Sequence, residues 1–446
     1  MTHRPRTPNA DLAALMQQAK WGNDQLARAV NRVGCEAGLR LTYDKSAISH
    51  WLSGSRPRTE VRGAIREAFS RRLGRPVTPE ETGFESETAP TGDPGGLGEL
   101  MSLGKADMDP SRRGVLAAGL YSLALTVPVF GDTAGRISHA AAGRTVRVGP
   151  GEVETVRAMT DRIAGILDEL GAAHARPMAA AFLVNSVGPW LQASGTARVR
   201  ADLLAAAADL TYLTGWMAMY ETAHGLGQKY YVQALELARE AQDHVTYCRT
   251  LRGMALQASN LGYGPKALEL ADSAAEAAPA SGPRLRAFLS GQQAHGAAMV
   301  KDRRQAFARL AETETALGQA EGRNDSVGGY DEAAYHFHVS HVLYELGDLP
   351  GAIKELQLSN RVRPANEKQG RVHGNGLLAR RQMELGHVEA ACATWDTFLD
   401  DYVTISSVRG DEHFRALDAS LPTHAANRTV RRLHQRTREV ARQKAA

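Results

Sequence analysis

The chain has few cysteines, few aromatic residues and almost no alternating runs of Val, Ile and Thr. Its three cysteines, Cys35, Cys248 and Cys392, lie far apart and form no CxxC pair. This argues against a zinc finger and a disulfide framework, and makes a reduced, cytoplasmic setting the expectation. Aromatic residues make up 6% of the 446 residues. Because strand-like alternation is nearly absent, we expect no substantial β-sheet.

Motifs for catalysis and export are also missing. The sequence contains no G-x-S-x-G, no H-E-x-x-H, no Walker loop and no recognisable Cys and His pair, so nothing predicts an enzyme or a bound cofactor. The first residues, MTHRPRTPNADL, contain no apolar run, and no N-terminal signal peptide is expected.

The charge is distributed unevenly along the chain. The net charge is +4, but Met1 to Arg75 contain 14 Lys and Arg against 6 Asp and Glu, which leaves about −4 for the remainder. At this length two or more domains are expected, and abundant Ala and Leu favour helices. A basic N-terminal part on a mildly acidic body is typical of a nucleic-acid-binding domain attached to something else.

The segment from Asp44 to Arg58 has the pattern of a DNA-reading helix. Asp44 is predicted to cap its start, and Gly54 is placed to end it. One face is apolar, with Ala47, Ile48, Trp51 and Leu52. The alternative is an ordinary surface helix with a solvated polar face. The candidate DNA contacts are the polar residues of the other face and the basic exit, Lys45, Ser46, Ser49, His50, Arg56 and Arg58.

Residues 12 to 84 resemble the lambda-repressor-like (XRE-type) helix-turn-helix domains of actinobacterial regulators. The resemblance rests on Gln25-Leu26-Ala27-Arg28, on the Ser46 to Leu52 segment, on Gly54 to Arg58 and on Arg71 to Pro76. It implies that Lys45, Ser46, Ser49 and His50 face the groove and that Asn23 and Gln25 contact phosphate. Asn23 is also expected to cap its own helix. The turn from Asn31 to Tyr43 is several residues longer than the family usually has.

Two segments separate this domain from the rest of the chain. Residues 86–110 are expected to form a flexible linker, because they are rich in Gly, Pro, Thr and Glu up to Gly98. Residues 111–150 contain Ser111-Arg112-Arg113 followed by an apolar run to Phe130, which looks like a twin-arginine export signal. We interpret this run as an apolar docking helix and connector, and keep an exported or membrane-associated protein as the alternative.

Residues 151–446 are predicted to form helical repeats. Small residues recur on successive second helices at Ala234, Ala267, Ala306, Ala352 and Ala391. Leu-Gly turns are expected at Gly227, Gly262, Gly347 and Gly386, because tight helix hairpins need a residue that tolerates a positive φ. The spacing resembles degenerate tetratricopeptide repeats. The basic tail after Asn427 reads as a closing amphipathic helix, with additional DNA contact as the alternative.

Stacked helix pairs form a concave surface that the first helix of each pair lines. The histidines His336, His338 and His341 lack a carboxylate at a standard ligand spacing, so they do not predict a metal site. The candidate effector residues are polar and aromatic positions on the first helices: Tyr212, Trp216, Tyr220, Arg249, Arg252, Asn260, Gln292, His295, Tyr335, His338, Arg371 and Asn375.

The sequence therefore predicts an all-α protein with a helix-turn-helix domain at 1–85, a linker at 86–110, a docking helix and connector at 111–150 and tetratricopeptide-like repeats at 151–446. The expected function is transcriptional regulation by a cytoplasmic homodimer on double-stranded DNA. A peptide, small-molecule or protein effector would occupy the repeat groove, with no metal, cofactor or membrane involved. The alternative is a protein–protein adaptor whose N-terminal domain does not bind DNA specifically.

Overall fold

A computed structural model describes residues 7–36, 39, 41–75, 77–84, 96–108, 121, 147–278, 282–320 and 330–445. Over these residues the chain is helical and has no β-strand, apart from one isolated bridge between Arg147 and Ser194. The predicted all-α class is confirmed. The stretch from Ser111 to Phe130 lies outside the described residues, except for Tyr121.

The head (residues 7–84) is a small helical bundle. Its elements are α1 (Ala10–Ala19), α2 (Asn23–Glu36), α3 (Lys45–Leu52), α4 (Thr59–Leu73) and the short 3-10 helix η1 (Glu80–Thr82). Asp44 caps α3 by accepting the N–H groups of Ser46 and Ala47, both at 3.0 Å. Gly54 follows the helix with a φ of 94°. Ile48 and Trp51 are buried in the head core, so the predicted cap, stop and apolar face of α3 are confirmed.

Two expectations about α2 are wrong. The helix continues to Glu36, so the connection to α3 covers residues 37–44 and is shorter than the predicted turn from Asn31 to Tyr43. The Asn31 side chain spans this connection, with hydrogen bonds of 2.8 and 2.9 Å to the backbone of Tyr43. Asn23 does not cap α2. Instead, the side-chain amide oxygen of Gln25 accepts the backbone N–H of Gly22 at 2.8 Å, which is one of the two hydrogen bonds of a capping box.

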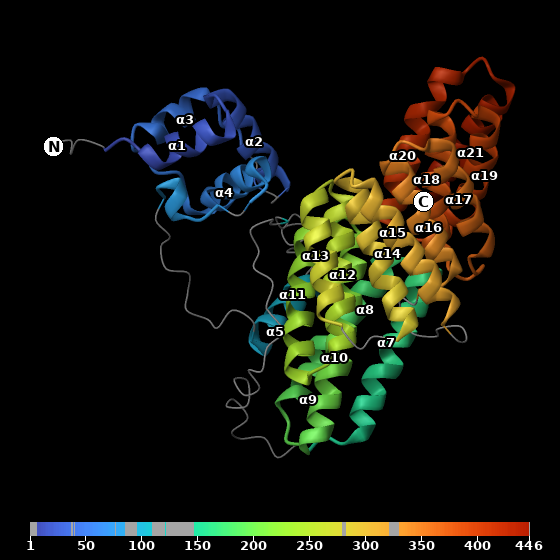
Figure 1. Cartoon of the computed structure of the whole chain (residues 1–446), viewed down its shortest axis with the longest axis horizontal. Helices are drawn as coiled ribbons and strands as arrows, with labels where there is room; N and C mark the ends of the chain where they lie inside the picture. The colour runs from blue at the N-terminus through green and yellow to red at the C-terminus, as the bar shows by residue number, and fades with distance from the viewer. Residues whose placement is uncertain are drawn as a thin grey trace.

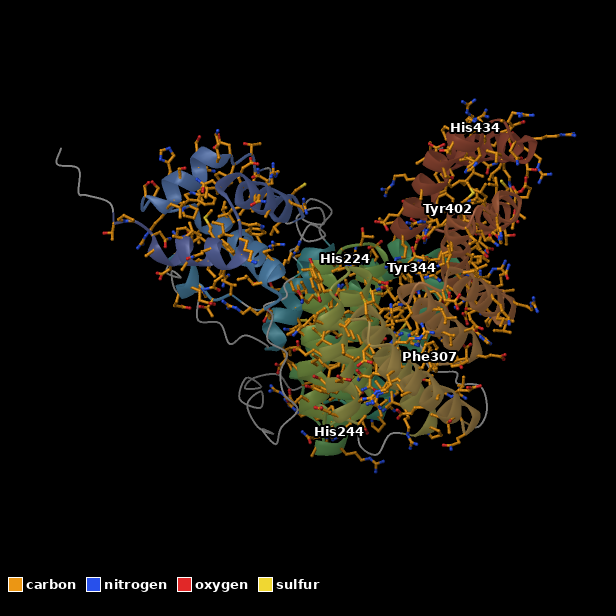
Figure 2. All side chains as sticks on the ribbon, turned by 45° about the horizontal axis from the view of Figure 1, so that its top comes forward. His224, His244, Phe307, Tyr344, Tyr402 and His434 are labelled. Atoms are coloured by element: carbon orange, nitrogen blue, oxygen red, sulfur yellow. The ribbon has the colours of Figure 1, made fainter. Side chains whose placement is uncertain are left out.

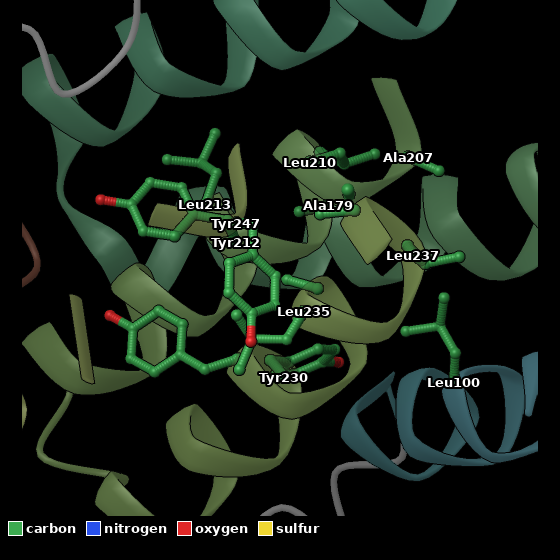
Figure 3. Packing of buried hydrophobic residues seen from close by; sticks show 14 of the residues in the cluster. Leu100, Ala179, Ala207, Leu210, Tyr212, Leu213, Tyr230, Leu235, Leu237 and Tyr247 are labelled. Carbon is green, nitrogen blue, oxygen red and sulfur yellow. The ribbon is translucent and has the colours of Figure 1, made fainter. Parts of the chain in front are cut away.

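The predicted linker contains an ordered helix, α5 (Leu97–Met108). Leu100 and Leu103 are buried against the repeat body, and Figure 3 shows Leu100 approaching Leu237. Asp107, also buried, forms an ion pair with Arg176 and accepts the Tyr230 hydroxyl at 3.0 Å. The flexible-linker prediction is therefore wrong for residues 97–108. The glycines suggested flexibility, but Gly104 permits a close approach to Val184.

The body (residues 147–445) begins with irregular helices and continues as stacked helix hairpins (Figure 1). The irregular part comprises α7 (Pro150–Leu170), α8 (Ala172–Phe182), the π-helix η2 (Leu183–Val187) and α9 (Gly188–Gln192). The hairpins are α10 (Ala197–Tyr220) with α11 (His224–Ala241), α12 (His244–Asn260) with α13 (Gly264–Glu276), α14 (Pro283–Met299) with α15 (Arg303–Gly318), α16 (Glu332–Glu345) with α17 (Leu349–Val362), and α18 (Lys368–Glu384) with α19 (Val388–Tyr402).

The repeat alignment made from the sequence holds in the structure. The aligned alanines Ala234, Ala267, Ala306, Ala352 and Ala391 all lie on second helices and are fully buried. Small side chains at these positions let the two helices of a hairpin pack closely.

The predicted turn glycines are confirmed at three of four positions. Gly262, Gly347 and Gly386 have φ values of 80–87°. Gly227 does not form a turn. It lies inside α11 and faces Gly215 of α10, where an added Cβ would come within 3.0 Å of the Gly215 oxygen. The turn between α10 and α11 uses Thr222 at a φ of 56°.

The two ends of the body are brought together by α7. This helix packs against both α10 and α18, and at its C-terminal end the Leu170 oxygen accepts the Ser406 N–H at 2.8 Å. Gly171 makes this contact possible, because a Cβ there would collide with the backbone oxygen of Ser406.

Beyond Ser406 come α20 (Val408–Ser420), the 3-10 helix η3 (Leu421–His424) and α21 (Arg428–Ala445). Helix α21 buries Val430, Leu433 and Val440 against α19. Arg436 pairs with Asp396 of the same helix α19 at 2.8 Å. The prediction of a closing amphipathic helix is confirmed. Figure 2 labels one residue on each of three helices of this part, Tyr344 on α16, Tyr402 on α19 and His434 on α21.

No helix within the described parts of the chain combines the length and apolar character needed to cross a membrane.

Two glycine-to-alanine substitutions should change stability in opposite directions. Gly296 of α14 packs against α13, and an added Cβ would lie 2.8 Å from the Leu268 Cα. Gly296→Ala should therefore lower the free energy of unfolding by about 1–3 kcal/mol. Gly165 lies inside α7 with no atom within 4 Å of an added Cβ, so Gly165→Ala should raise it by about 0.5–1 kcal/mol. Urea denaturation followed by circular dichroism measures the free energy of unfolding of both variants. A change of the same sign in both would contradict the packing described.

Candidate functional site

Five of the eight candidate DNA-contact residues gather on one surface of the head. Asn23 and Gln25 from α2 line a surface depression together with Lys45, Ser46 and Ser49 from α3. His50, Arg56 and Arg58 are also exposed, in and beyond α3. The α2–α3 arrangement therefore brings five of the eight predicted residues together, and we call the depression and these residues the head face.

Hydrogen bonds within the head face fix how its two helices meet. The Asn23 amide donates to the Ser49 hydroxyl at 2.8 Å, and Gln25 accepts the Gly22 N–H. Lys45 and Ser46 extend from the first turn of α3 and are exposed. Asn23 and Gln25 thus have structural roles in addition to the predicted phosphate contacts. Each keeps further donor and acceptor capacity, since an amide side chain has two N–H groups and two lone pairs.

Acidic groups also belong to this surface. Asp24 lines the depression and pairs with Arg28 at 2.5 Å. Hydrogen bonds from the backbone of Ala47 and Ser46 lower the pKa of Asp44, so this carboxylate remains charged at neutral pH.

A cavity of about 540 Å³ lies inside the repeat body. The first helices α10, α12, α14 and α16 form much of its wall, as predicted for the concave side of a solenoid. Helix α7 and the segment that leads into α18 close it, and Arg409 of α20 reaches it from the C-terminal end. This volume is typical of small-molecule sites.

Six of the twelve candidate effector residues line the repeat cavity: Tyr212, Trp216, Tyr220, Arg252, Asn260 and His338. The other six contact neighbouring helices. Arg249 pairs with Asp209, Gln292 bonds Ser259, His295 packs on His341, Tyr335 packs on the cluster that contains Ala287 of α14 and Ala316 of α15, Arg371 pairs with Asp401, and Asn375 bonds Asn360.

The sequence reasoning missed several cavity residues, notably Asp168, Phe288, Arg363, Glu367 and Arg409. Only Phe288 belongs to a first helix of a hairpin. Asp168 comes from α7, which lies across the groove, and Arg409 from α20, beyond the last predicted repeat. Their helices reach the cavity only because α7 meets the C-terminal end of the body, and no local sequence pattern signals that contact.

Aromatic rings lie against two arginines that line the cavity, the buried Arg252 and the half-buried Arg409. The Arg252 guanidinium carbon lies 4.1 Å from the Phe288 ring centre and 5.5 Å from that of Trp216. The Arg409 guanidinium carbon lies 5.6 Å from the Tyr220 ring centre. Trp216 and Tyr220 themselves meet edge to face. Burial lowers the pKa of both guanidinium groups, because aromatic faces compensate a desolvated charge only in part.

His338 orients Arg252 through a defined tautomer. Burial keeps the pKa of His338 well below its usual value, so the ring is neutral. Its Nε2 lies 3.4 Å from Arg252 Nη2 and must accept, because a guanidinium only donates. The proton therefore sits on Nδ1 and is donated to the Tyr330 hydroxyl at 2.9 Å.

Other charged groups also line the cavity. Arg363 pairs with Glu367 at 3.0 Å, and Asp168 of α7 is a further lining residue. Burial, reinforced by the negative charge of Glu367, raises the pKa of Asp168 to about 7.

The three histidines weighed as a metal site point to different partners. His336 bonds Glu355 at 2.7 Å, His338 bonds Tyr330 and His341 packs on Phe337. Within the described residues, no group of three or more His, Cys, Asp or Glu side chains is arranged to hold a metal ion.

Comparison with known proteins gives limited matches. Residues 12–85 match the family model of the SP15 N-terminal domain, which covers nearly the whole head. No curated protein matches the chain in sequence. Among solved structures, the crystal structure of Rap protein complexed with competence and sporulation factor is similar, with a TM-score of 0.37 and 14% identity, over 66% of this chain and 88% of that one.

Removing the buried carboxyl of Asp168 should stabilise the body in a pH-dependent way. Because its folded pKa is raised from 3.8 to about 7, the folded state holds this proton more tightly than the unfolded state. Stability is therefore lost as pH rises from about 4 to about 7. Asp168→Asn should have little effect near pH 4 and raise the free energy of unfolding by about 1–2 kcal/mol at pH 8. Glu169→Gln is the matched control, and equal effects at both pH values would refute the burial argument.

Proposed function

We propose that this protein is an effector-responsive regulator that binds double-stranded DNA through its head and a ligand through its repeat body. The observation that carries this proposal is the head face, where polar and basic side chains of α2 and α3 gather on one exposed surface. The resemblance of residues 12–84 to helix-turn-helix domains supports the same function.

The head face and the other exposed residues of α3 and its exit have the residue types that DNA recognition uses. Lys45, Arg56 and Arg58 supply charge for phosphates, whereas Ser46, Ser49 and His50 offer hydrogen bonds to base edges. Helix α3 is held from behind by Trp51, which packs on Tyr43 and Phe84. Such rigid support is needed for a short helix to read a groove.

We further propose that the protein acts as a homodimer. Helix α3 has eight residues and reaches few base pairs, so two heads would be needed for selective binding to a site.

The second candidate function is that of a protein–protein adaptor. It is favoured by Asp24 and Asp44, two charged carboxylates on the surface that would meet phosphate groups. Under this alternative the head contacts another protein, and the repeat body carries the main activity.

The salt dependence of DNA binding tests the regulator proposal. The triple variant Lys45→Ala, Ser49→Ala, Arg56→Ala removes two cations from the head. If both contact phosphates, the slope of log K against log salt should become less negative by about 1.8. Fluorescence anisotropy on duplexes selected from a random pool by the wild-type protein, at several salt concentrations, measures this slope and the affinity.

The matched control is Arg438→Ala with Arg442→Ala on α21, which removes the same charge from an exposed surface distant in sequence from the head. This control should leave slope and affinity unchanged. If no duplex is enriched over nonspecific competitor, or if the control and the triple variant lose binding equally, the adaptor becomes the better account.

A further inference from the structure

The repeat cavity contains a buried cation that lacks an anionic partner. Arg252 is 5% exposed and lines the cavity. Its Nε and Nη1 atoms have no hydrogen-bond partner that meets normal geometry. Its polar neighbours are a neutral histidine ring nitrogen, 3.4 Å from Nη2, and the hydroxyl of Tyr212, and neither carries a negative charge. Buried charged donors are normally paired, because leaving them unpaired is costly. The arrangement therefore leaves donors available for an anion inside the cavity.

Arg409 adds a second cation to the same cavity. It lies against Tyr220, whose ring meets Trp216 beneath Arg252. Among the described residues, neither Arg252 nor Arg409 forms an ion pair with a carboxylate. Arg363 differs, since Glu367 already neutralises it. Arg252 and Arg409 are thus the cavity cations to which an anionic group would bind in preference to Arg363.

The surrounding side chains define the rest of the ligand. Trp216, Tyr220 and Phe288 present aromatic surfaces beside the two guanidinium groups. A flat, apolar body can stack on such rings while its charged end reaches the arginines. Arginine favours planar anions, because its fork of N–H donors matches the two oxygens of a carboxylate. The cavity of about 540 Å³ suits a small molecule.

We propose that the repeat cavity binds a small aromatic carboxylate, with its carboxylate on Arg252 and Arg409 and its ring against Trp216, Tyr220 and Phe288. His338 positions Arg252 for this contact by accepting from Nη2, and Tyr330 fixes the tautomer of His338. This proposal rests on the proposed effector function of the body and gives the ligand a chemical class.

Matched pairs of acids and amides test the ligand class on the wild-type chain. The probes are benzoate, phenylacetate and indole-3-acetate, each compared with its neutral amide, and inorganic phosphate. Titration calorimetry at pH 7.5 should show that at least one acid binds and that its amide binds at least tenfold more weakly, because only the acid pairs with the guanidinium groups. Phosphate should bind more weakly than the best acid, because it has no ring.

Arg252→Gln should weaken binding of the best acid by tenfold or more, whereas Arg252→Lys, which keeps the charge, should weaken it less. Arg381→Gln is the matched control. Arg381 is also buried, with its guanidinium carbon 4.4 Å from the Tyr344 ring centre, but it does not line the cavity. Its variant should bind the acid as the wild type does. Thermal melting identifies any variant that fails to fold, and the acid–amide comparison does not depend on the variants.

Three results would overturn the proposal: no binding by any of the acids, equal binding of acid and amide, or tighter binding of phosphate than of every acid. The last would assign the site to inorganic or phosphoryl anions instead. None of these titrations involves DNA, so failure of the DNA-binding proposal and failure of the carboxylate proposal are distinguishable.

Discussion

The packing of α7 against α10 and α18, with the hydrogen bond between Leu170 and Ser406 at its end, brings the two ends of the repeat body together, and the cavity depends on this contact. An open solenoid presents a groove to solvent. Here α7 lies across that groove and meets the chain again at Ser406 through Gly171, whose missing side chain allows the backbones to touch. This contact places Asp168 and Arg409, more than two hundred residues apart, in the walls of one cavity.

Closure also explains why the charges in the cavity have the pattern observed. An arginine on an open groove would keep its water and need no partner. Because α7 shields these groups from part of the solvent, their charges need compensation by protein or by ligand. Arg363 forms an ion pair with Glu367, and burial raises the pKa of Asp168, which favours its neutral form. Arg252 contacts aromatic rings, a neutral histidine and the Tyr212 hydroxyl, none of which carries a negative charge, so the compensation of its charge is incomplete.

Sequence reasoning succeeded where structure is set locally. Caps such as Asp44, positive-φ turns such as Gly262 and small residues such as Ala352 act within one hairpin, so their spacing alone predicts the repeats. It failed where distant segments meet. The glycine-rich composition of residues 86–110 predicted a flexible linker and not the helix α5, but Gly104 allows close packing against Val184. Half of the effector candidates pair with neighbouring helices, since a position on a first helix does not determine which way its side chain points.

The proposed function requires a connection between the proposed ligand site and the head, and α12 lies between the two. This helix carries Arg252 and Asn260 in the cavity wall and ends just before Tyr263. Tyr263 stacks on Tyr121, whose backbone oxygen accepts from Arg71 of α4 at 3.2 Å. Any ligand that shifts α12 along its axis therefore acts on the contact between body and head, because a helix transmits displacement as a rigid element. Coupling between the two sites then requires only that this contact differ between the occupied and empty cavity.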